Sequence, residues 1–71
     1  MSRYNFPVIL DAEYQTLDQV TEPLVLLQAR CGQVDVTLGV PPSCPGVRII
    51  VRRAGEYPAA FVKGYLEGRG L

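Results

Sequence analysis

The sequence predicts an all-β fold: one antiparallel β-barrel or sandwich of five to six short strands over residues 1–71. The first reason is an unbroken alternation over residues 33–40, where Val34, Val36, Leu38 and Val40 fall on one side and polar residues fall on the other. The second is the close spacing of turn-forming residues, and the third is the lack of a clear 3.6-residue period. Short strands at such spacing are typical of small barrels and sandwiches.

The N-terminal part predicts two short strands. The first, Tyr4–Leu10, contains Pro7, which a strand tolerates only at an edge or before regular pairing begins. The second covers Tyr14–Asp18. Residues 12–20 are the best helix candidate, but their apolar positions do not hold a helical period and they include the β-formers Tyr14 and Val20. We therefore expect no helix.

The most apolar segment, Leu24–Cys31, predicts the third strand. Leu24–Leu27 is apolar on both faces, which indicates a strand covered on both sides or one whose outer face meets another molecule. The dipeptide Cys31-Gly32 predicts a hairpin, because glycine can adopt the positive φ of such a turn. Residues 33–40 would then form the antiparallel fourth strand.

The C-terminal part predicts a loop and two further strands. Three prolines in residues 40–46 prevent a regular ladder. The strand Val47–Arg53 alternates again, and its side chains divide into an inward set (Val47, Ile49, Val51) and an outward set (Arg48, Ile50, Arg52). A turn at residues 54–58 leads to a last strand, Ala59–Leu66, and residues 66–71 are expected to be a flexible end.

The small size of the chain suggests that it needs added stabilisation. A 7.8 kDa chain buries only about 60% of the surface its unfolded form exposes, and such chains often rely on a disulfide, a metal or a partner subunit. No histidine and only two cysteines argue against a structural metal. No secretory signal or membrane span is visible, so reduced thiols are the default and a Cys31–Cys44 disulfide stays open.

The residues that usually carry catalysis are scarce. Without histidine, the chain lacks the usual general base and the partner of a serine or cysteine nucleophile. The acids at positions 11, 13, 18 and 22 match no calcium loop and lie in turn-like sequence, and no glycine-rich phosphate loop precedes a helix. We therefore predict a protein that is not an enzyme, with no catalytic residue, no metal and no cofactor.

The charges balance overall but are segregated along the chain. The formal net charge is zero, which argues against a polyanion as an obligatory partner. Residues 1–29 hold one base against four acids, a net charge of −3, and residues 30–71 hold six bases against three acids, a net charge of +3. Two interpretations stay open. Either the acidic half of one subunit docks on the basic half of another, or the charged side chains simply lie on solvated faces of the protein.

Three segments of the pattern resemble small all-β structural proteins of tailed-phage virions, of the head-decoration, cement or fibre type. They are Tyr14-Gln15-Thr16, Val34–Gly39 before the proline-bearing loop, and Phe61-Val62-Lys63-Gly64. The resemblance implies a symmetric homo-oligomer on the virion surface, made in the host cytoplasm and bound to a capsid or other virion protein. No membrane partner is expected, and the resemblance transfers no functional residue.

The leading hypothesis is a non-enzymatic structural or assembly protein that acts through protein–protein contacts. We predict an interface built on Leu24, Leu26 and Ile50, with Arg48 and Arg52 at its rim. Two alternatives stay open. One is a small barrel that binds single-stranded nucleic acid through four residues: Arg48, Arg52, Arg53 and Tyr57. The other is a phage-encoded inhibitor that binds a host protein.

Overall fold

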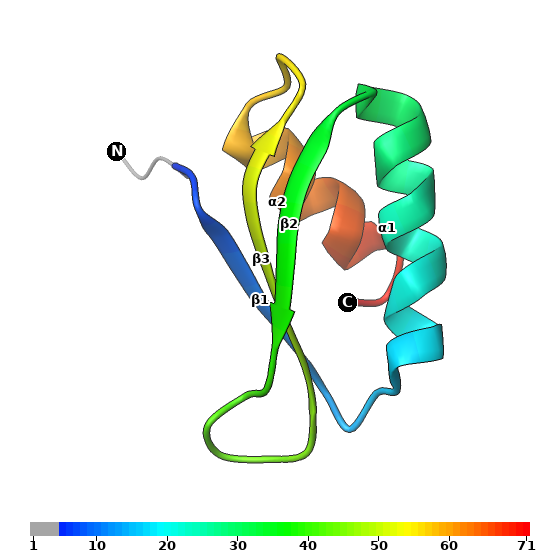
Figure 1. The fold of residues 1–71 in the computed structure, drawn as a ribbon, viewed down its shortest axis with the longest axis vertical. Helices are drawn as coiled ribbons and strands as arrows, with labels where there is room; N and C mark the ends of the chain where they lie inside the picture. The colour runs from blue at the N-terminus through cyan, green and yellow to red at the C-terminus, as the bar shows by residue number, and fades with distance from the viewer. Residues whose placement is uncertain (1–4) are drawn as a thin grey trace.

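The chain adopts an α+β fold in a computed structural model that describes residues 5–71 (Figure 1). The elements in chain order are strand β1 (Val8–Glu13), helix α1 (Leu17–Cys31), strands β2 (Val34–Gly39) and β3 (Gly46–Ala54), and helix α2 (Ala59–Gly68). The prediction of an all-β barrel or sandwich with five to six strands is therefore wrong, because the described residues form two helices and an open three-stranded sheet.

The sheet has the order β1-β3-β2, and both pairs are antiparallel. In the central strand β3, Ile50 lies opposite Ile9 of β1 and Thr37 of β2. The register between β2 and β3 shifts between Asp35 and Val36, so that Arg52 is the extra residue of a β-bulge. The bulge lies near the end of β3 that leads to α2.

Helix α1 occupies residues 24–31, where the sequence predicted a strand. Residues 14–18, also predicted as a strand, are instead the turn and N-cap that lead into this helix, followed by its first two residues. It begins with a capping box in which Thr16 and Gln19 each bind the other's backbone N–H, and this motif fixes the first turn. Val20 and Leu27 face the core on its inner side. The hairpin expected at Gly32 is also wrong: Gly32 has a positive φ of 88°, but it ends the helix by donating its N–H to the Gln28 carbonyl at 2.7 Å.

Helix α2 replaces the strand predicted at residues 59–66. Its buried residues Ala59, Val62 and Leu66 have helical spacing, and Lys63 and Glu67 form an i,i+4 ion pair. The residues expected to be a flexible end continue this helix to Gly68, and Leu71 then packs against the core.

The predictions for the other strands hold more closely. Strands β2 and β3 lie within about a residue of the expected ranges, and Val47, Ile49 and Val51 are buried while Arg48, Ile50 and Arg52 alternate with them. The first strand is shifted from its expected range, because β1 begins directly after Pro7 and continues to Glu13, three residues past the expected end at Leu10. The expected start of the first strand at Tyr4 lies outside the described residues.

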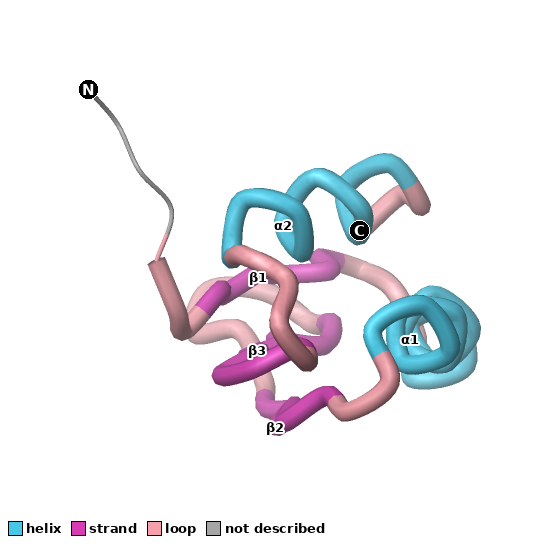
Figure 2. The backbone as a smooth tube through the Cα atoms, turned by 90° about the horizontal axis from the view of Figure 1, so that it is seen from above, coloured by secondary structure: helices cyan, strands magenta, loops and turns pink. Residues whose placement is uncertain are grey.

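Both helices contribute to one core against the same face of the sheet. Buried side chains from β1, β3, α1 and α2 form a single cluster. Figure 2 shows α1 beside the sheet and α2 above β1, with the other side of the sheet left uncovered by the described residues. The fold therefore has two layers, and one face of the sheet is open.

Candidate interaction surface

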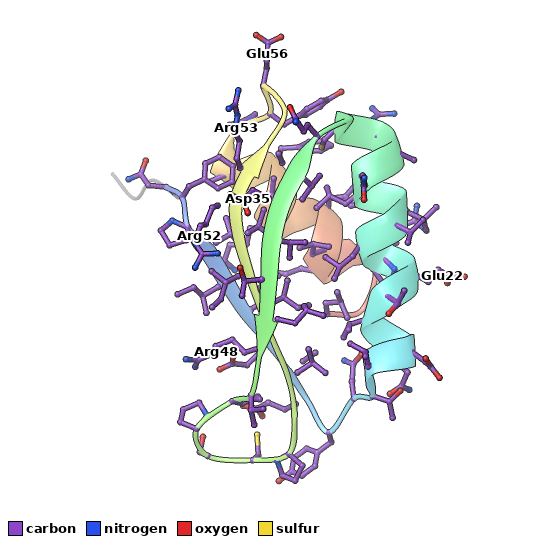
Figure 3. The ribbon with its side chains drawn as sticks, in the orientation of Figure 1. Glu22, Asp35, Arg48, Arg52, Arg53 and Glu56 are labelled. Carbon is purple, nitrogen blue, oxygen red and sulfur yellow. The ribbon has the colours of Figure 1, made fainter. Side chains whose placement is uncertain are left out.

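The open sheet face is the surface on which we centre the candidate site. Side chains alternate between the two faces of a strand, so the residues next to the buried positions of β1 and β3 point away from the helices. We define the open sheet face by its outward residues: Ile9, Asp11, Glu13, Asp35, Thr37, Arg48, Ile50, Arg52 and Arg53. Figure 3 shows Arg48 and Arg52 projecting from β3 on the side away from α1.

The centre of the open sheet face is apolar. Ile9 and Ile50 are directly opposed cross-strand partners, and Thr37 continues the same row on β2. Ile9 is 51% exposed and Ile50 is half-buried. Two isoleucines side by side on an uncovered sheet face form a small apolar patch. Burial of this patch against a partner would remove apolar surface from water, which is favourable in free energy.

One ion pair borders this row towards the proline-bearing loop. Arg48 donates from Nε to Asp11 Oδ1 at 2.7 Å and from Nη2 to Oδ2 at 2.9 Å, and the two residues are cross-strand partners. This hydrogen bonding holds the pKa of Asp11 below its ordinary value of 3.8, and it raises the pKa of Arg48. The pair fixes both side chains beside the isoleucines.

We expect Asp11→Asn to lower the free energy of unfolding at neutral pH, with a smaller loss in acid. Because the folded-state pKa of Asp11 is depressed, its stabilisation is present above the unfolded-state value of 3.8 and disappears as the pH falls through the folded-state value. Urea titrations at neutral pH and well below 3.8 measure the difference from the wild type. Asp35→Asn is the control, and an Asp11→Asn effect of equal size in acid would contradict the prediction.

The opposite end of the face, beyond the bulge, is basic. Arg52 donates a hydrogen bond from Nη1 to Thr37 Oγ1, and Arg53 lies opposite Asp35. Within residues 5–71, neither arginine forms an ion pair. An open hollow of about 370 Å³ adjoins this end and is lined by Gln33, Val34, Asp35 and Arg53.

The structure separates the interface residues predicted from the sequence. Arg48, Ile50 and Arg52 lie on the open sheet face, as the alternation indicated. Leu24 and Leu26 lie on α1 instead, where Leu24 packs against the core and Leu26 is half-buried. The five residues therefore do not form one surface.

Sequence reasoning missed five residues of this surface: Ile9, Asp11, Glu13, Asp35 and Thr37. Ile9, Asp11 and Thr37 are cross-strand neighbours of the β3 residues that were predicted. Asp11 in particular was expected to be a solvated turn residue. Alternation within Val8–Glu13 would have placed Ile9 and Asp11 on one face, but only the strand register places them beside Ile50 and Arg48.

The two cysteines are free, so the structure contains no Cys31–Cys44 disulfide. Cys31 packs against the core, and desolvation raises the pKa of its thiol. Desolvation also raises the pKa of Cys44, and the nearby Glu13 carboxylate adds to the rise. A raised pKa disfavours the reactive thiolate at both positions.

The described residues show neither a cluster of metal ligands nor a membrane-spanning helix. Residues 5–71 hold no group of three or more metal-ligating side chains of the His, Cys, Asp and Glu types. Neither described helix has the length and apolar character needed to span a bilayer. No family model, curated protein or solved structure matches this chain.

Proposed function

We propose that this protein is a non-enzymatic assembly module that binds a second copy of itself through the open sheet face. The observation that carries the proposal is the row of Ile9 and Ile50 on a face that no described helix covers. A layered fold gains stability when each apolar face of a sheet meets another layer. Stacking on a second sheet would supply that layer, at the spacing of about 10 Å seen between packed sheets.

The size of the face sets the expected strength of association. Six residues per strand at about 3.3 Å and three strands about 4.8 Å apart give a patch of roughly 20 by 14 Å. This is well below the area of about 800 Å² per partner in a standard interface. We therefore expect a weak, concentration-dependent dimer with a Kd in the micromolar range or above.

Two features weigh against the alternative of single-stranded nucleic acid. Arg48 is held by Asp11, and the same face also carries Glu13 and Asp35. A polyanion would meet these carboxylates as well as the arginines.

The virion role is not part of the proposal, because the resemblance that suggested it implied an all-β fold, and α1 and α2 contradict that fold.

The proposal is tested by sedimentation velocity on a concentration series of the wild type and of Ile50→Lys. We expect the wild type to sediment faster as its concentration rises, and we expect Ile50→Lys to weaken association by at least about tenfold, because it buries a charge in the apolar centre. Circular dichroism checks that the variant is folded.

The matched control is Val25→Lys on α1, since Val25 is 57% exposed and lies outside the open sheet face. It should leave association unchanged. A wild type that stays monomeric to millimolar concentration would overturn the proposal, and so would an equal loss in both variants. Salt-dependent binding of a single-stranded oligonucleotide by a monomeric wild type would favour the nucleic-acid alternative.

A further inference from the structure

Charge divides the open sheet face along the direction of its strands. On one side of the row of Ile9, Ile50 and Thr37 lie Asp11, Glu13 and Arg48, a net charge of −1. On the other side lie Arg52, Arg53 and Asp35, a net charge of +1. We call the first group the acidic end and the second the basic end.

We infer that the second copy packs face to face with its strands reversed, so that the basic end of each copy lies over the acidic end of the other. This inference rests on the proposed self-association and specifies its geometry. The two-fold axis would lie in the plane of the interface, perpendicular to the strands, and pass through the row of Ile9, Ile50 and Thr37.

The spacing along β3 determines which residues face each other in this arrangement. Arg48 and Arg52 each lie two residues from Ile50, on opposite sides of it. Rotation about the row therefore brings Arg52 of one copy over Arg48 and its partner Asp11 in the other, while Ile50 meets Ile50. Because Asp11 neutralises Arg48, the uncompensated charge at the acidic end is Glu13, which lies opposite Gly46, two residues beyond Arg48 along the sheet.

The alternative two-fold axis runs parallel to the strands and gives the opposite result. It would place the basic end of one copy against the basic end of the other, with Arg52 and Arg53 facing their own copies. Like charges opposed across an interface are unfavourable. Charge complementarity therefore selects the reversed arrangement, and the same self-complementarity favours a second copy over an unrelated protein as the occupant.

Charge reversal with mixing of variants tests this geometry. We expect Arg52→Glu and Glu13→Lys each to weaken self-association by about tenfold, because both opposed ends in each homodimer then carry a net charge of the same sign. An equimolar mixture of the two variants should recover association to within about threefold of the wild type. In the mixed dimer, the end that carries Glu at position 52 lies over the end that carries Lys at position 13, and the other two opposed ends keep the native Arg52 and Glu13.

Fluorescence-detected sedimentation of one labelled variant, with the other added in excess, measures the recovery. Glu22→Lys is the control, since Glu22 projects from α1 away from the open sheet face (Figure 3), and it should change neither association nor recovery. If mixing gives no recovery while Ile50→Lys still abolishes association, this geometry is wrong and the proposed function stands. If the wild type never self-associates, both are wrong.

Discussion

Leu27→Ala should lower the free energy of unfolding by about 2–5 kcal/mol, the range for removing a large side chain from a core. Leu27 is fully buried in α1, in the same cluster as Val20, Ile49 and Leu66. A chain of 71 residues has a total stability of about 4–11 kcal/mol. The substitution therefore removes a large fraction of the stability.

Urea denaturation followed by circular dichroism measures this loss. Leu17→Ala is the matched control, because it makes the same chemical change in the same helix at a side chain that is 55% exposed. We expect that control to change stability by less than about 1 kcal/mol. Equal losses in the two variants would contradict the packing of α1 against the sheet.

Gly55→Ala should be the second large loss, of about 2–4 kcal/mol. Gly55 has a φ of 59°, a conformation that residues with a Cβ seldom adopt, and an added Cβ would collide with the carbonyl oxygen of Cys31. The Gly55 N–H also donates to the Gln33 carbonyl at 2.6 Å, so this turn joins the end of β3 to the link between α1 and β2. The backbone at Gly55 therefore cannot move away from Cys31 without breaking the hydrogen bond to Gln33.

Gly64→Ala is the control for Gly55→Ala, and it should change stability in the opposite direction. Gly64 lies within α2, and an added Cβ there meets no atom within 4 Å. Alanine is favoured over glycine in a helix interior by up to about 1 kcal/mol, so this variant should be more stable than the wild type. Thermal melts of both variants measure the direction of each change in stability. A Gly64→Ala variant that is less stable than the wild type would contradict the assignment of α2.

The strands could be predicted from the sequence because their signal is local. In β3 the alternation of Val47, Ile49 and Val51 with Arg48, Ile50 and Arg52 gives both the element and its buried face, since a strand has a period of two. The strand order could not be predicted in the same way. Placing β3 between β1 and β2 depends on how α1 returns the chain across the sheet.

Helix α1 was missed because its composition resembles a strand. Val20, Thr21 and Val25 are β-branched, and Pro23 lies inside the helix. Extra apolar residues at Val25 and Leu26 also hide the helical stripe. The pair Thr16 and Gln19 was the signal that could have revealed the helix, because its three-residue spacing is that of a capping box.

Only part of the candidate site could be predicted from the sequence. Ile50, Arg48 and Arg52 follow from alternation within one strand, so their common face was predictable. Leu24 and Leu26 were assigned to the interface only because their segment was interpreted as a strand with two apolar faces. Ile9 joins the surface through its pairing with Ile50, which is a long-range contact that local sequence does not encode.

The most direct test of self-association through the open sheet face is a dilution series followed by amide chemical shifts in ¹H–¹⁵N NMR spectra. The account predicts concentration-dependent shifts at Ile9, Thr37 and Ile50, with much smaller changes at Leu17 and Val25 on the outer side of α1. Changes confined to α1, or no change between micromolar and millimolar protein, would contradict it.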